Sequence, residues 1–225
     1  MLNLKAQAAI ASLFFAAAAG TAGAATTNAF ANGGFELPGG TLAAGWLSAP
    51  TGNPVMLSND AHSGAHSVLL TVPNGFGAST VFQDSVAHGG MAPLGAANAG
   101  DTPVFSFWAK GDVSTTGNLL FALSYMGAAG QRLGGTGNQF VQNLINPLTW
   151  SEISFQTGAI PVGTTAVFLE INTAVGPLLD GRINAVYVDD VQLALHTAAV
   201  PEPESYALLL AGLGVVVAIA RRRRA

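Results

Sequence analysis

The feature that most constrains the fold is a series of short runs in which apolar residues alternate with polar or small ones. In residues 104–110, Phe105, Phe107 and Ala109 share one parity, and residues 118–125 repeat the pattern. Alternation with a period of two over about five to eight residues, bounded by Gly, Pro, Asn or Asp, is typical of strands with one buried face. Between the two ends of the chain no segment has the spacing of an amphipathic helix.

These runs predict an all-β body of about eight or nine strands, arranged as a sandwich or a barrel. Two stretches are expected to be irregular, 87–102 and 127–138, and the second is expected to be a mobile loop because it holds five glycines. The expected strands are 55–58, 66–72, 79–86, 104–110, 118–125, 140–142, 150–156, 166–172 and 185–195.

The first 25 residues have the organisation of a secretory signal peptide. Lys5 is the only charged residue among the first 35, and it precedes an apolar run at 8–19 that only Ser12 interrupts. The small residues Ala22, Gly23 and Ala24 fit the Ala-x-Ala cleavage rule. We therefore expect residues 1–25 to be removed, rather than to form a core helix, and the body to span 26–197.

Three segments follow one another at residues 198–225: Pro201-Glu202-Pro203, an uncharged apolar stretch at 206–220, and Arg221-Arg222-Arg223-Arg224. Four arginines beside an apolar helix stay on the cytoplasmic side of a membrane. Fifteen helical residues span about 22 Å, less than the hydrocarbon core of about 30 Å, which favours a transient transmembrane helix. This tail resembles the PEP-CTERM sorting signal of Gram-negative bacteria.

That resemblance implies an exosortase-like partner that cuts near Pro201-Glu202-Pro203. The protein would pass through an inner-membrane intermediate and reach the cell surface or its matrix. A plain tail anchor is the alternative.

The charge of the body excludes one class of partner. Residues 26–200 hold three basic and ten acidic residues, a net charge of −7, whereas the whole chain has −4. Nucleic-acid binding needs clustered Lys and Arg, so we exclude it. The chain has no cysteine, which excludes thiol catalysis and disulfides.

Four motifs occur in a fixed order along the body: Asn-Gly-Gly-Phe-Glu at 32–36, His-Ser-Gly-Ala-His at 62–66, Phe-Ser-Phe-Trp-Ala-Lys-Gly at 105–111 and Tyr-Val-Asp-Asp-Val at 187–191. Together they resemble the galactose-binding-like jelly roll found in many carbohydrate-binding modules. The resemblance implies an antiparallel jelly-roll β-sandwich.

The resemblance also implies a structural Ca²⁺ where the first strand, the Ser-Gly loop and the last strand meet. Its ligands would be Glu36, one carboxylate of Asp189 and Asp190, and backbone oxygens near 59–63 that include Ser63. Calcium accepts such mixtures of carboxylate and carbonyl oxygens. Asp189 shares its parity with Tyr187, Val191 and Leu193, so we expect it to point inward, where it needs a partner. The alternative is that Asp189 caps a turn through backbone N–H groups.

The aromatic side chains are the candidate sugar-binding residues. Trp108 is out of phase with Phe105 and Phe107, which places it on the outer face of its sheet, and it is the leading candidate; a covering loop is the alternative. Tyr125 and Phe140 are weaker candidates. No Gly-x-Ser-x-Gly, His-Glu-x-x-His or phosphate-binding glycine motif is present, so the chain is not expected to be an enzyme.

The leading hypothesis is thus an exported, non-catalytic protein of the surface or extracellular matrix that contacts exopolysaccharide weakly. One alternative is a purely structural or adhesive surface protein without a sugar site. Another is a small polysaccharide-active enzyme that uses two of the three glutamates Glu36, Glu152 and Glu170.

Both ends are predicted to be removed in the native host. Intact-mass measurement of the secreted protein should give a chain that begins near Ala25 and lacks Arg221–Arg224. A mature chain that keeps the four arginines would contradict exosortase processing and leave the tail anchor.

Overall fold

The computed structural model describes residues 26–49, 51–87, 94–95, 98–196 and 222. The body, Thr26–Thr197, is a compact unit with its own core. The expected signal peptide, the apolar stretch at 206–220 and every residue of the sorting motif except Arg222 lie outside the described residues. No helix in the described ranges is long and apolar enough to cross a membrane.

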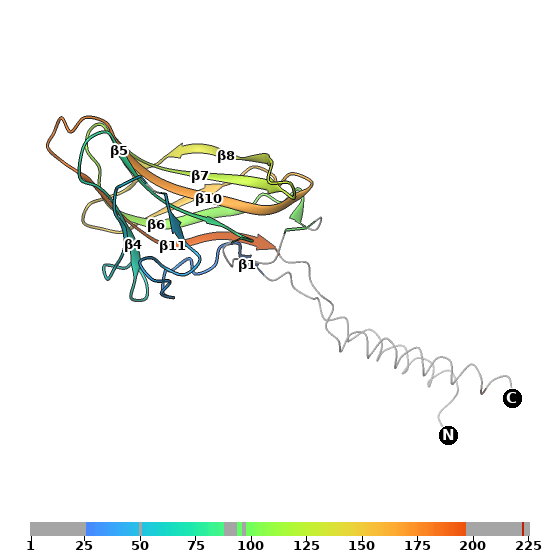
Figure 1. The fold of residues 1–225 in the computed structure, drawn as a ribbon. Helices are drawn as coiled ribbons and strands as arrows, with labels where there is room; N and C mark the ends of the chain where they lie inside the picture. The colour runs from blue at the N-terminus through green and yellow to red at the C-terminus, as the bar shows by residue number, and fades with distance from the viewer. Residues whose placement is uncertain (1–25, 50, 88–93, 96–97, 197–221, 223–225) are drawn as a thin grey trace, which may run out of the picture. The chain divides into compact units, whose positions relative to one another are not determined.

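The body is an all-β sandwich of two antiparallel sheets, as predicted (Figure 1). The first sheet has the order β3-β4-β11-β6-β9, with β1 also paired to β11, and the second has the order β2-β5-β10-β7-β8. The strands are β1 (Thr26–Asn28), β2 (Leu47–Ser48), β3 (Val55–Ser58), β4 (Ser67–Val72), β5 (Gly77–Asp84), β6 (Val104–Asp112), β7 (Gly117–Gly127), β8 (Arg132–Phe140), β9 (Ser151–Gln156), β10 (Thr164–Val175) and β11 (Asn184–His196).

The alternating residues of facing strands form the core between the sheets. On β6, Phe105 and Phe107 are fully buried, and the ring of Phe105 lies 4.8 Å from that of Phe121 on β7. Fully burying an aromatic side chain of this size contributes about 1.5–3 kcal/mol. The period-two pattern therefore located the core correctly.

Strand β8 is the main departure from the sequence prediction. Most of the expected loop at 127–138 is an edge strand paired with β7, and its register shifts twice. Gly135 and Gly137 adopt φ values of 141° and 63°, which other residues rarely adopt, so they let the strand pair across these irregularities. The expected strand at 140–142 is instead the end of β8 followed by a 3₁₀ turn at Gln142–Leu144.

The first and last strands of the body lie side by side, as expected. Thr26 pairs with His196, and Asn28 with Ala194. The Asn28 side chain donates to the Val191 carbonyl at 2.9 Å and accepts from the N–H groups of Phe30 and Leu193. The β1–β11 contact is therefore held by a side-chain clamp as well as by the ladder.

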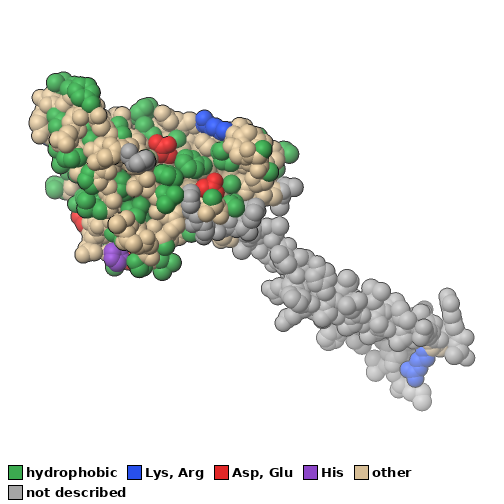
Figure 2. Space-filling view, viewed as in Figure 1, with side chains coloured by type: hydrophobic (Ala, Val, Ile, Leu, Met, Phe, Trp, Pro, Cys, Tyr) green, Lys and Arg blue, Asp and Glu red, His purple; other side chains and the backbone are tan. Residues whose placement is uncertain are grey.

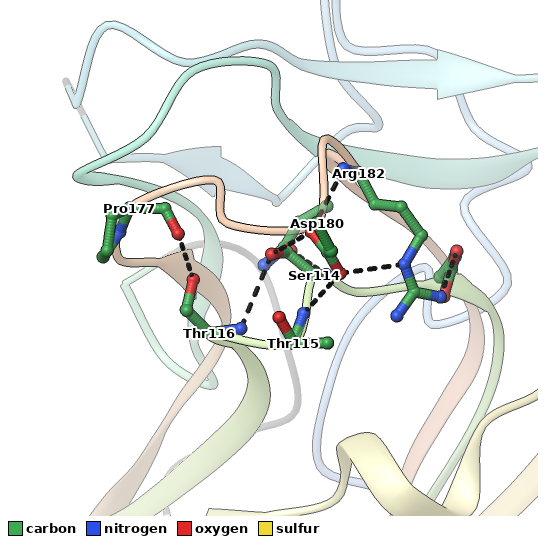
Figure 3. Close-up of polar contacts among 8 residues, drawn as sticks. Ser114, Thr115, Thr116, Pro177, Asp180 and Arg182 are labelled. Atoms are coloured by element: carbon green, nitrogen blue, oxygen red, sulfur yellow. Dashed lines mark hydrogen bonds and ion pairs between the residues drawn. The ribbon is translucent and has the colours of Figure 1, made fainter.

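Loops at one end of the sandwich are joined through Asp180 (Figure 3). Its carboxylate accepts hydrogen bonds from the Thr115 N–H, the Ser114 hydroxyl, and the N–H and Nε of Arg182. These bonds, led by that from Thr115, hold the pKa of Asp180 far below its usual value. Arg182 also pairs with Asp112, which ties the β10–β11 loop to β6.

Replacing Asn28 by alanine should lower the free energy of unfolding of residues 26–197 by about 1–3 kcal/mol, because the N–H groups of Phe30 and Leu193 lose their acceptor. Urea denaturation measures this change. The exposed Thr26→Ala is the matched control and should change stability little; equal effects of the two variants would contradict the clamp.

Candidate functional site

The four residues predicted to bind calcium do come together at one junction. Glu36 follows the N-terminal segment, Ser63 lies in the β3–β4 loop, and Asp189 and Asp190 belong to β11. Ser63 contacts both aspartates: its N–H donates to Asp189 Oδ2 at 3.1 Å and its hydroxyl donates to Asp190 Oδ1 at 2.7 Å. Ser63 thus joins the β3–β4 loop to β11 at this junction.

Asp189 is fully buried, but it does not point into the sandwich core. It pairs with the outward-facing Trp108, and the register of β11 shifts between Asp189 and Gln192, where Asp190 has a φ of 48°. This bulge reverses the parity, so Val191 faces the core while Asp189 lies outside, under the β3–β4 loop. The expectation from parity was wrong because it assumed a regular strand.

The Asp189 carboxylate accepts three backbone hydrogen bonds, from the N–H groups of His62, Ser63 and Asp190. Burial raises the pKa of this carboxyl, and the three N–H groups oppose that rise. This is the turn-capping arrangement given above as the alternative to calcium binding.

The other carboxylates of the junction also have protein partners. Glu36 accepts from the N–H groups of His66 and Ala65, which lower its pKa, and its oxygens occupy the space that a Cβ at Gly64 would need. Asp190 Oδ2 lies 2.7 Å from His62 Nδ1.

The donor set of the junction only partly suits a calcium ion. Within the described ranges no group of three or more His, Asp or Glu side chains is arranged to hold a metal. A calcium ion would have to replace some of the hydrogen bonds to Glu36 and Asp190, and calcium at this junction stays a prediction.

Trp108 is half-buried, and its indole is covered by the imidazole of His62. The two ring centroids are 3.7 Å apart with an interplanar angle of 10°. Lys110 lies over the rings of Trp150 and Tyr187 and pairs with Asp60 of the same β3–β4 loop. These contacts fasten the loop to the outer face of the first sheet, so a covering loop, the alternative for Trp108, is what the structure shows.

The two weaker aromatic candidates have opposite environments. Tyr125 is 1% exposed and its hydroxyl bonds to Thr157, so no ligand can reach its ring, contrary to its choice as a candidate. Phe140 is 60% exposed at the end of β8, opposite Leu120 on the outer face of the second sheet.

That outer face carries a patch that the sequence analysis did not single out. It consists of Phe82 and Asp84 on β5 and Phe168 and Glu170 on β10, which we call the outer-face patch. Phe168 pairs with Asp84, and Glu170 pairs with Phe82. The Phe82 and Phe168 rings meet along one diagonal, with centroids 5.7 Å apart, so the two carboxylates occupy the other two corners.

The carboxylates of this patch differ in their partners. Asp84 Oδ1 accepts from the N–H groups of Val86 and Ala87. Glu170 makes no hydrogen bond or ion pair with any residue in the described part of the chain. In the sequence, the alternation of Glu170 with Leu169 and Ile171 indicated an exposed strand face. The strand that pairs beside Glu170 could not be identified from the sequence.

The three glutamates considered for hydrolysis lie in three different places. Glu36 is bound at the junction, Glu152 is paired with Trp108 on the first sheet, and Glu170 lies on the second. The outer faces of the two sheets point in opposite directions, so Glu170 cannot form a glycosidase pair with Glu36 or Glu152.

Comparison with known proteins identifies the tail. Residues 199–224 match the family model described as the PEP-CTERM protein-sorting motif. The chain carries a PEP-CTERM sorting motif. This motif indicates export and sorting to the cell surface. No curated protein sequence matches the chain.

The fold of the body has counterparts among solved structures. The enzymatically active domain of bacteriophage CBA120 tailspike protein 4 is similar with a TM-score of 0.56 and 15% identity, over 75% of this chain and 21% of that one. The chain thus spans about a fifth of the tailspike chain.

Two carbohydrate-binding modules are similar at lower TM-scores. The C-terminal family 22 module of Clostridium thermocellum Xyn10B has a TM-score of 0.43 and 19% identity over 76% of this chain and 99% of that one. TmCBM61, solved with β-1,4-galactotriose, has a TM-score of 0.45 and 16% identity, over 74% of this chain and 97% of that one.

The calcium prediction is tested by thermal melting of residues 26–197 in millimolar calcium and in chelator. Calcium at a hundredfold excess over its Kd adds about 2.7 kcal/mol, a shift of about 2–4 °C for each kcal/mol in a domain of this size. Glu36→Gln should abolish the shift, and Glu152→Gln on the first sheet should keep it. If the wild-type melting curves in calcium and in chelator superimpose, the calcium prediction is wrong, and the junction is held by its hydrogen bonds alone.

Proposed function

We propose that this protein is an exported, non-catalytic component of the cell surface or extracellular matrix that binds polysaccharide weakly through the outer-face patch. An exosortase-like enzyme processes its tail and releases it from a transient membrane intermediate. The sorting motif at 199–224 supports the destination, and the exposed chemistry of the second sheet supports the binding role.

The observation that carries the proposal is the alternation of apolar and acceptor groups in the patch. A sugar ring has apolar C–H faces and hydroxyl groups around its edge. The Phe82–Phe168 pair offers a half-buried apolar surface for a ring face. Asp84 and Glu170 at the other corners can accept hydrogen bonds from hydroxyls, and such charge-assisted bonds are stronger than neutral ones.

The surroundings of the patch suit a neutral, hydroxyl-rich partner as well. Thr80 and Asn172 pair across the same two strands, with Asn172 bonded to the Thr80 hydroxyl. In the view of Figure 2, hydrophobic and neutral side chains cover most of the surface of the body and charged ones are isolated. Weak binding is expected, because few side chains take part and hydroxyls must leave water.

A non-catalytic role is supported by the positions of the acids. Asp84 and Glu170 share a face, but the phenyl pair lies between them, and Asp84 is bound to its own turn. A hydrolase needs one carboxylate on each side of a scissile bond. The similarity to the tailspike domain supports the fold only.

The test is affinity electrophoresis of residues 26–197 in gels that contain soluble polysaccharides. Wild type should be retarded, and Phe168→Ala should lose most of the retardation because the apolar surface is halved. The matched control is Glu152→Gln on the opposite sheet, which should migrate like wild type. Unfolding of each variant is followed by urea, so that loss of binding is separated from loss of fold.

An absence of retardation in every gel would contradict polysaccharide binding and favour the purely structural or adhesive role. Reducing ends released from a polysaccharide by the wild type, and lost in Glu170→Gln, would instead show an enzyme.

A further inference from the structure

The chain contains two Asn-Gly dipeptides, Asn32-Gly33 and Asn74-Gly75. In such a dipeptide the backbone nitrogen of the glycine can attack the side-chain amide carbon of the asparagine. Glycine favours this attack because it has no side chain to obstruct the approach and because its backbone adopts many conformations. The reaction still needs a mobile asparagine side chain, so the surrounding fold decides whether each dipeptide reacts.

The first dipeptide is held on all sides. Asn32 Nδ2 donates to the carbonyls of Leu37 and Ala44 at 2.9 and 3.1 Å, and Asn32 Oδ1 accepts from the Leu37 N–H at 3.0 Å. The Gly33 carbonyl accepts from the Val191 N–H at 2.9 Å. Attack on the Asn32 amide carbon would require all three side-chain bonds to break together, so this dipeptide reacts only through local unfolding.

The second dipeptide lies in the β4–β5 loop and is free by comparison. Asn74 is exposed, and its side chain makes no hydrogen bond or ion pair with any residue in the part of the chain that the structure describes. The loop is tied to its neighbour one residue after the dipeptide, where the Phe76 N–H donates to the Gly176 carbonyl at 2.9 Å. The Asn74 amide can therefore turn toward the Gly75 nitrogen without breaking a side-chain bond.

The glycine of this dipeptide is required by the contact between the β4–β5 and β10–β11 loops. The Cβ of any other residue at position 75 would lie 3.0 Å from the Gly176 carbonyl oxygen and 3.5 Å from Pro177 Cα. The first distance is tighter than most Cβ contacts in proteins. The packing of the two loops therefore places a glycine directly after an exposed asparagine.

We propose that Asn74 is a site of spontaneous deamidation in the folded protein. The Gly75 nitrogen loses its proton to solvent base and forms a bond to Asn74 Cγ. The bond between Cγ and Nδ2 then breaks, and the amide nitrogen takes up a proton and leaves as ammonia. One water molecule opens the resulting five-membered succinimide at either carbonyl, which gives an aspartate or an isoaspartate. The sum is amide plus water to acid plus ammonia, with no oxidant and no cofactor.

This reaction adds a negative charge to the end of the body opposite β1. The β10–β11 loop leads into the first residue of β11, whereas β1 pairs with the last three residues of that strand. The same loop already carries the group of Figure 3, in which Arg182 is shared by Asp180 and Asp112. An ageing population of the protein should therefore accumulate a more acidic form, and in its isoaspartate fraction the main chain of the β4–β5 loop is one atom longer.

The test is peptide mass mapping of residues 26–197 after incubation in buffer, with the conversion of each asparagine to its acid followed over time. Asn74 should react roughly tenfold faster than Asn32 or more, which corresponds to a difference in activation free energy of about 1.4 kcal/mol. The rate at Asn74 should rise with pH, because the Gly75 nitrogen attacks only after it loses its proton. In concentrated urea the two dipeptides should react at similar rates, because the hydrogen bonds of Asn32 are lost.

Two variants connect the acidic form to this residue. Asn74→Gln should stop its appearance in isoelectric focusing, because the longer side chain cannot form the five-membered ring, and its urea denaturation should match that of the wild type. The matched control is Asn143→Gln, at an exposed asparagine that precedes a leucine, and it should leave the acidic form unchanged.

Two results would overturn the proposal. Equal rates at Asn32 and Asn74 in the folded protein would show that the fold does not select between the dipeptides. Conversion of Asn74 in urea but not in the folded protein would show that the β4–β5 loop holds its backbone away from the geometry of attack.

Discussion

The pairing of β11 with its neighbours is the interaction on which the rest of the structure depends. This 13-residue strand joins β4 and β6 in the middle of the first sheet and also receives β1 at its end. Its inward residues complete one wall of the core. Its single bulge, at Asp190, turns Asp189 outward to meet the β3–β4 loop. Sheet, core and terminal junction therefore share one element.

The bulge also explains why the junction is polar. A carboxylate buried under a loop is costly unless donors surround it, and here the loop supplies the N–H groups of His62 and Ser63. The same loop is held from outside by the His62–Trp108 stack. The loop is therefore held both by hydrogen bonds to Asp189 and by aromatic packing on Trp108.

The fold class and most strands could be predicted from sequence, because alternation records burial directly. The pattern failed at β8, because this edge strand has glycines in place of alternating apolar residues. It pairs with β7 through its backbone. The pattern also failed at Asp189, because the extra residue of the bulge reverses which side chains face the core. The amino-acid composition does not reveal such a bulge. Tyr125 was wrongly chosen as a sugar-binding candidate. It shares the parity of the buried Leu123, which indicated a position in the core.

The junction could be predicted because four motifs lie in a familiar order, whereas the outer-face patch could not. Phe82 and Glu170 are 88 positions apart and belong to strands whose partnership depends on sheet order. Sheet order is a property of the whole topology, which no local pattern reports.

One consequence follows from the register that places Thr26 opposite His196. Neighbouring strands lie about 4.8 Å apart, so the chain enters and leaves the body through a single narrow gap. The body is therefore suited to insertion into another protein. If it replaced a surface turn of an unrelated host protein, the two host strands that flank the turn could keep their spacing. Joining the same two ends with a short linker would allow new termini to be opened in another loop, with both sheets retained.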